Sequence, residues 1–126
     1  MIKTALCFSL LLISVAARAE EIVTWKPFLR QNGNVYYWNE PTKISNAISR
    51  IMYRSDHTSI ANLSDGTQYD SADLVMEINC EKRVWHALAQ EYFIAGRSIR
   101  ISRTPQPWEP VVPGTIGERI ANRACH

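Results

Sequence analysis

Three consecutive segments in the second half of the chain alternate between apolar and polar residues and are joined only by short turns. The segments cover residues 74–80, 83–93 and 97–103. Leu74, Met76 and Ile78 share one side of the first segment, and Ile99 and Ile101 share one side of the third. A period of two is typical of β-strands with one buried face, and short turns join such strands in antiparallel order. The sequence therefore predicts an antiparallel meander with these five residues on its inner side.

The middle segment of the meander is long and mixed in character. One side is expected to carry Val84, His86, Leu88, Gln90 and Tyr92, and the other side Trp85, Ala87, Ala89 and Phe93. This assignment assumes that the two-residue period runs through the segment without interruption.

Three further strands precede the meander, and a hairpin turn joins the first two. Asn32-Gly33 lies between the apolar stretches 23–28 and 35–38, and this dipeptide is typical of tight hairpins. Residues 47–54 alternate with Ile51 and Tyr53 on the expected inner side. The spacing over 44–52 also fits a helical period, but we favour a strand.

The polar stretch from Asp56 to Asp73 is the longest candidate loop, with a turn at Asp65-Gly66. Long loops often carry binding residues. The stretch is therefore a candidate binding loop, and an ordinary solvated connection is the alternative.

The C-terminal region is predicted to form an extended segment followed by a helix. Four prolines between Thr104 and Gly114 exclude a central strand, and Trp108 is expected to pack this segment onto the sheet. Thr115 and Glu118 have the spacing of a capping box, which opens a helix that ends at about Ala124. A helix packed across one face of an antiparallel sheet gives an α+β fold.

The N-terminal segment has the pattern of a secretory signal peptide. Lys3 precedes an apolar run over residues 5–15, and Ala17-Arg18-Ala19 matches a small-x-small cleavage site. The run is shorter than the roughly 20 residues of a spanning helix, and Cys7 lies too near its start for a lipidation box. We therefore expect a signal peptide over residues 1–19, a single domain over residues 20–126, no membrane span and no lipid anchor.

Cleavage also changes the charge of the protein. The full chain has 14 Lys and Arg residues against 12 Asp and Glu residues. Removal of Lys3 and Arg18 leaves equal numbers of each sign. A neutral mature chain has no compositional signal for nucleic acid or anionic membranes, so neither is an expected partner.

Cys80 and Cys125 are the two cysteines that remain after cleavage. An even pair in an oxidising compartment predicts one disulfide, which would tie the end of the helix to the end of a strand. The alternative is a redox-active pair, but such pairs usually have Cys-x-x-Cys spacing, which this chain lacks.

Catalytic and metal-binding motifs are not evident. His57, His86 and His126 are scattered without metal-ligand spacing, and there is no Gly-x-Ser-x-Gly sequence. We therefore expect no cofactor, no metal and no enzymatic activity. A small hydrolase built from dispersed residues is an alternative, which a cleft gathering His57 or His86 beside a carboxylate would support.

Aromatic and arginine side chains are the remaining functional signal. Their mixture is typical of protein-binding surfaces, although aromatic residues also fill the cores of small domains. The predicted protein-binding surface consists of Trp38, Arg50, Arg54, His57 and Arg100.

One ordered set of features resembles the bacterial surface-adhesin protein E family. It consists of Cys80-Glu81-Lys82-Arg83, Tyr92-x-x-x-Gly96, Trp108-x-Pro110-x-x-Pro113-Gly114-Thr115 and a terminal helix closing on Cys125, preceded by the aromatic strand Val35-Tyr36-Tyr37. The resemblance implies a six-stranded antiparallel sheet with a C-terminal helix held by a Cys80–Cys125 disulfide. The family's name-giving member is an adhesin that binds host extracellular-matrix and serum proteins.

Two main functional hypotheses follow. The first is an exported, non-enzymatic domain that binds proteins through an exposed sheet face or the stretch from Asp56 to Asp73. The second is a soluble periplasmic accessory or inhibitor protein with a bacterial or phage partner. The neutral charge and the missing lipidation cysteine leave both hypotheses open.

Overall fold

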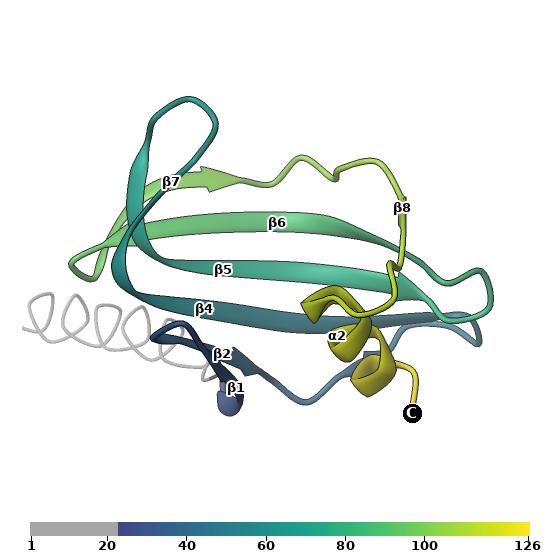
Figure 1. Cartoon of the computed structure of the whole chain (residues 1–126). Coiled ribbons are helices and arrows are strands. Elements are labelled where there is room, and N and C mark those ends of the chain that lie inside the picture. The colour runs from purple at the N-terminus through teal and green to yellow at the C-terminus, as the bar shows by residue number, and fades with distance from the viewer. Residues whose placement is uncertain (1–22) are drawn as a thin grey trace, which may run out of the picture.

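The computed structural model describes residues 23–126, so the predicted signal peptide and Cys7 lie outside the described residues. The strands are β1 (Lys26–Gln31), β2 (Asn34–Trp38), β3 (Thr42–Lys43), β4 (Ile48–Asn62), β5 (Gln68–Asn79), β6 (Val84–Ile94), β7 (Arg97–Ser102) and β8 (Glu109–Pro110). One helix, α2 (Ile116–Ala124), follows them and lies against the sheet (Figure 1).

The strands form one antiparallel sheet in the order β1-β2-β4-β5-β6-β7. The short strands β3 and β8 add to β4 and β6 respectively. Six strands on the main path, a C-terminal helix and the meander of β5, β6 and β7 confirm the predicted α+β fold. Residues 48–54 form part of a strand and not a helix.

Two hairpin turns have positive φ at both central residues, a geometry that the Asn-Gly sequence of the first favours and that is uncommon for the alanine of the second. Asn32 and Gly33 join β1 to β2 with φ values of 53° and 80°, and Ala95 and Gly96 join β6 to β7 with 50° and 77°. Positive φ at both central residues matches the right-handed twist of the flanking strands. At Gly33 a side chain is excluded for a second reason, because a Cβ atom would lie 2.6 Å from Thr58 Oγ1.

The predicted long loop from Asp56 to Asp73 is wrong. β4 continues to Asn62 and β5 begins at Gln68, which leaves a short connection around the Asp65-Gly66 turn. These strand ends were not recognised in the sequence because they are rich in polar residues, as the sheet there is not covered on both faces. In addition, the pairing of β4 with β5 is irregular between Asp56 and Ala61. An irregular register hides the alternation by which a strand is recognised.

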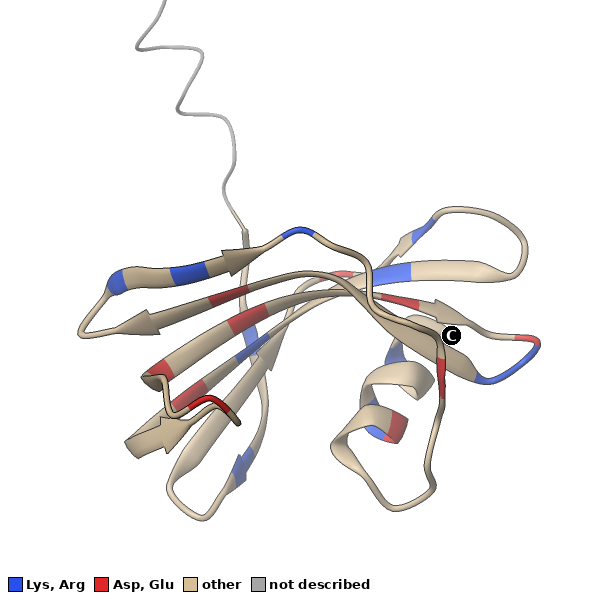
Figure 2. Cartoon of the chain, turned by 90° about the horizontal axis from the view of Figure 1, so that it is seen from above, with Lys and Arg blue, Asp and Glu red and all other residues tan. Residues whose placement is uncertain are grey.

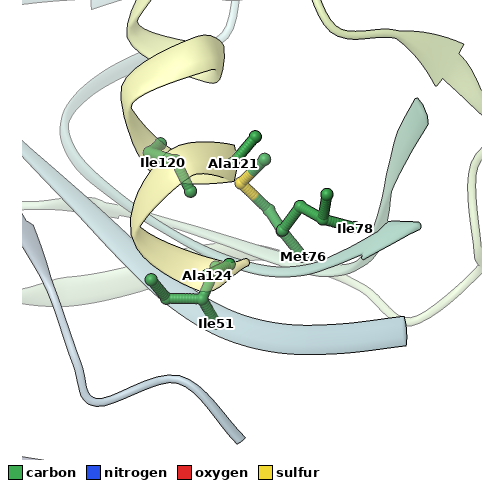
Figure 3. Packing of buried hydrophobic residues seen from close by; sticks show 6 residues of the cluster. All are labelled: Ile51, Met76, Ile78, Ile120, Ala121 and Ala124. Atoms are coloured by element: carbon green, nitrogen blue, oxygen red, sulfur yellow. The ribbon is translucent and has the colours of Figure 1, made fainter. Parts of the chain in front are cut away.

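The core lies between α2 and the middle of the sheet (Figure 3). Ile51, Met76 and Ile78 from β4 and β5 contact the helix residues Ile120, Ala121 and Ala124, and all six are at most 6% exposed. The helix begins as predicted, because Thr115 Oγ1 accepts a hydrogen bond from Glu118 N at 3.2 Å. The Glu118 carboxylate reaches back to Gly114 N at 3.3 Å.

The disulfide between Cys80 and Cys125 confirms the predicted pairing. It joins the end of α2 to the residue that follows β5. The disulfide therefore holds α2 against the sheet at the core, and it joins cysteines with a sequence separation of 45.

The face assignments of β6 and β7 are wrong in part. Met76 pairs with Ala87 and Val75 pairs with Ala89, so Leu88 is an extra residue that reverses the alternation along β6. In β7, Ile99 and Ile101 are 40% and 52% exposed and do not point inward. β7 is the last strand of the sheet and α2 packs over the middle strands, so neither isoleucine reaches the core.

Candidate protein-binding surface

The sheet face opposite α2, here called the open face, carries no helix among residues 23–126 (Figure 2). Ile51 points toward α2, so its strand neighbours Arg50, Met52 and Arg54 point to the open face. Strand pairing extends each of them into a row across the sheet. The rows are Arg50–Glu77–His86, Met52–Val75–Ala89 and Tyr37–Arg54–Asp73–Glu91–Ile101.

An ion pair lies at the centre of the open face. Arg54 donates two hydrogen bonds to Asp73, with Nε–Oδ1 at 2.6 Å and Nη2–Oδ2 at 2.7 Å. The guanidinium also lies 4.6 Å from the centre of the Trp25 ring. Hydrogen bonding to Asp73 raises the pKa of Arg54, and partial burial acts in the opposite direction. A bidentate pair held against an aromatic ring has one fixed geometry.

Two hollows lie on the open face, one on either side of this pair. The first has a volume of about 480 Å³ and is lined by Arg54, Asp56, His57, Asp70, Ser71, Phe93 and Gly96. The second has a volume of about 280 Å³ and is lined by Met52, Asp73, Val75, Ala89, Gln90, Glu91, Ile101 and Arg103. Arg54 belongs to the first and Asp73 to the second, so the ion pair forms the wall between them.

The first hollow is polar on one side and aromatic on the other. Asp56 Oδ1 accepts a hydrogen bond from Ser71 Oγ at 2.8 Å, and Asp70 Oδ2 accepts one from Ala95 N at 3.0 Å. Phe93 supplies the aromatic wall. The hollow can therefore receive a side chain that combines polar groups with apolar surface.

The row of Arg50, Glu77 and His86 is already engaged within the protein. Glu77 accepts hydrogen bonds from Arg50 Nη2 at 2.9 Å and from His86 Nε2 at 3.0 Å. The other ring nitrogen of His86 lies 3.0 Å from the carbonyl oxygen of Gln106, and the ring stacks on Trp108 at 3.8 Å. Both ring nitrogens of His86 therefore face acceptor oxygens within the protein.

These contacts shift the titration of Glu77 and fix the C-terminal segment. Burial is the largest single influence on Glu77 and raises its pKa, but the hydrogen bonds from His86 and Arg50, together with the charges of these two side chains, outweigh burial, so the pKa is lowered. The His86 ring also holds the segment before α2 against β6, where Trp108 was expected to pack it. This row therefore contributes to stability.

The structure brings together three of the five residues predicted for the binding surface. Arg50 and Arg54 lie on the open face, and His57 lines the first hollow. Trp38 lies on the helix side, where it stacks on Phe28 at 3.9 Å. Arg100 pairs with Tyr92 on the helix side and donates a hydrogen bond to Asp65 at 2.5 Å.

The predicted set of five did not include several residues that lie on this surface. They are Trp25, Asp73, Phe93 and Ile101. Each lies on a different strand or segment, and the strand register brings them to one face. The alternation of β5 contained a signal, because it placed Val75 on the side opposite Met76, and Asp73 shares that side.

The residues of the first hollow give little support to the alternative that the protein is a small hydrolase. His57 does lie there with Asp56 and Asp70, as that alternative requires. Its side-chain hydrogen bond within residues 23–126 is with Ser55 Oγ, at 3.2 Å, and Ser55 is only 5% exposed. A buried serine without a carboxylate on the other side of the histidine does not form a catalytic triad.

Two further properties concern the described part of the chain. Among residues 23–126 there is no group of three or more His, Cys, Asp or Glu side chains placed to hold a metal ion. Within the same residues, no helix has both the length and the apolar character to cross a membrane.

Comparison with known proteins identifies the family. The family model described as surface-adhesin protein E matches residues 25–126. No curated protein and no solved structure matches the chain significantly. The match begins at Trp25 beside Arg54 and extends through the helix and its disulfide to the C-terminus. The chain therefore belongs to the surface-adhesin protein E family.

Proposed function

We propose that this surface-adhesin-like protein is an exported, non-enzymatic domain that binds a protein partner through its open face. Host extracellular-matrix and serum proteins are the proposed class of ligand, as the family resemblance implies. The observation that carries the proposal is the pair of hollows separated by the Arg54–Asp73 ion pair.

The composition of the open face supports a protein ligand. Aromatic residues, methionine and arginine are enriched in protein interfaces, and Trp25, Phe93, Met52 and Arg54 all lie around the hollows. In this proposal the hollows accept side chains of a partner. Because the Arg54 side chain is already held in place by Asp73, binding loses less side-chain conformational entropy there.

Export is the second part of the proposal. It rests on the signal-peptide pattern of residues 1–19 and on a disulfide, which persists in oxidising compartments. Cell fractionation tests where the protein resides. Recovery from the medium or the cell surface supports contact with a host, whereas recovery from the periplasm alone favours a bacterial partner.

A matched pair of variants tests the binding surface. Arg54→Ala removes the ion pair between the hollows. Arg123→Ala removes a similar pair on the helix side, where Arg123 Nη2 lies 2.6 Å from Glu40 Oε1. The two arginine side chains have nearly equal exposure, 33% and 35%, and both lie over a tryptophan ring.

Binding to immobilised matrix and serum proteins, each measured separately, distinguishes the two variants. We expect Arg54→Ala to weaken binding by about tenfold or more, as loss of a central interface arginine does, and Arg123→Ala to bind like the wild type. Equal affinities for the wild type and both variants, with the fold intact by circular dichroism, would contradict the open face as the binding surface.

A further inference from the structure

We infer that the outer edge of β7 is a second docking site, which takes an extended acidic segment of a partner protein as an added strand. This inference concerns the backbone of one edge strand and the charges beside it, although Ile101 and Arg103 also line the second hollow of the open face. It specifies both the geometry of the partner, an extended chain, and its chemistry, acidic side chains.

The first argument is that β7 has a free outer edge. β7 pairs with β6 alone, and no other backbone hydrogen bonds of residues 97–102 are present in the described part of the chain. Five of its six residues are exposed. An edge strand presents a row of backbone donors and acceptors that another extended chain can pair with.

The second argument comes from the opposite edge of the sheet, which is protected. β1 contains Pro27, which has no N–H group, and its register is irregular between Pro27 and Leu29. The carbonyl oxygen of Phe28 also accepts a hydrogen bond from Arg119 at 3.3 Å. Proline is a common protection of edge strands. The pairing of β7 with β6 is also irregular, between Tyr92 and Phe93, but β7 contains no proline.

The third argument is charge. Arg97, Arg100 and Arg103 lie along or directly after β7, and the segment between them contains no acidic residue. Arg100 is paired with Asp65, but Arg97 and Arg103 have no carboxylate within ion-pair distance among residues 23–126. Two arginines at opposite ends of one strand favour an acidic occupant.

The same charges disfavour a second copy of this chain. If two β7 strands were paired in either direction, arginines of one copy would lie beside arginines of the other. Like charges placed opposite one another destabilise a strand pair. The exposed side chains of Ile99 and Ile101 further favour an occupant that contains β-branched as well as acidic residues.

Labelled synthetic peptides test the inference on the full mature protein. The probe is a Glu-Val repeat of about eight residues, long enough to span a strand of this length. A Lys-Val repeat of equal length is the control. We expect the Glu-Val peptide to bind at least about tenfold more tightly, since opposite charges attract and like charges repel the second peptide. The preference should weaken as salt is added.

Hydrogen exchange shows where the peptide binds. We expect the Glu-Val peptide to slow exchange at the amides of residues 97–102 and to leave those of residues 26–31 unchanged. The double variant Arg97→Glu/Arg103→Glu is expected to reverse the peptide preference. Both arginines are exposed and lie outside the hydrogen bonds described above, so the variant should fold.

Several results would overturn the inference. They are absence of binding, equal binding of the two peptides by the wild type, and binding without protection of residues 97–102. Protection of these amides on raising the protein concentration alone would assign the edge to a second copy. Loss of adhesin-type binding in Arg54→Ala with normal peptide binding would separate this site from the open face.

Discussion

Each face of the sheet carries an ion pair between an arginine and a carboxylate beside a tryptophan ring, but only one of the two faces is covered by α2. On the helix side, Arg123 pairs with Glu40 over Trp38, and on the open face Arg54 pairs with Asp73 over Trp25. The first pair borders a packed core, whereas the second separates two hollows. An ion pair over an aromatic ring therefore does not by itself mark a binding site. What covers the pair decides whether a partner can reach it.

The largest expected effect lies on the helix side and concerns the disulfide. Cys125→Ser should destabilise the oxidised protein by about 4 kcal/mol, because the bond closes a long loop in the unfolded chain. The sequence separation of Cys80 and Cys125 is 45. Thermal unfolding of both proteins, in oxidising and in reducing buffer, measures this effect.

The reducing buffer is the control for this variant. Wild type and Cys125→Ser should then unfold at similar temperatures, since neither contains the bond. Equal midpoints in oxidising buffer would show that the disulfide does not stabilise the fold.

A second comparison tests the two faces within one strand. Ile78 is fully buried under α2, and Val75 lies on the open face beside a hollow. Ile78→Ala should cost roughly 3 kcal/mol through lost burial and a residual cavity, whereas Val75→Ala should cost about 1 kcal/mol or less. Urea denaturation measures both values. Equal losses would mean that the open face is as tightly packed as the helix side.

Most of the difference between the helix side and the open face could be predicted from the sequence. The alternation of Leu74, Met76 and Ile78 predicted the inner side of β5, and Thr115 with Glu118 predicted the start of α2. These signals are local, because the period of a strand and the cap of a helix involve residues that are close in the sequence. The disulfide was also predictable, since the two cysteines that follow the predicted signal peptide allow one pairing.

The irregular positions were not predictable in the same way. The extra residue Leu88 reverses the faces of β6, and an irregular register hides the strand that follows Asp56. A bulge is defined by the partner strand, so the two-residue period of a single strand cannot locate it. All three errors in the predicted fold arise from such irregularities or from the edge position of β7.

The candidate site was predicted only in part for a related reason. Tyr36, Tyr37 and Trp38 are consecutive aromatic residues, so their sequence does not indicate which of them faces the core. Pairing of Trp38 with Tyr53 and of Tyr37 with Arg54 makes that choice. Trp38 therefore belongs to the helix side, and Trp25, which was not among the five predicted surface residues, accompanies Arg54.

The smallest expected effect is a pH dependence that belongs to the open face. In the folded protein, hydrogen bonds from His86 and Arg50 hold the pKa of Glu77 below its usual value of 4.5, despite partial burial. A carboxyl with a lowered folded-state pKa stabilises the protein above its unfolded-state pKa, and this contribution is lost as the pH falls through the folded-state pKa. Stability should therefore decline below about pH 4.5, in part because of Glu77.

Glu77→Gln isolates this contribution, because glutamine has a similar shape and no titrating proton. The variant should be less stable than the wild type at pH 7, and the difference should shrink as the pH falls below about 4.5. Urea denaturation from pH 7 to pH 3 measures the two curves. Glu91→Gln controls for the loss of one negative charge, since Glu91 lies on the same face without an ion-pair partner among residues 23–126. A constant difference between wild type and Glu77→Gln over the whole range would mean that Glu77 does not link the open face to pH.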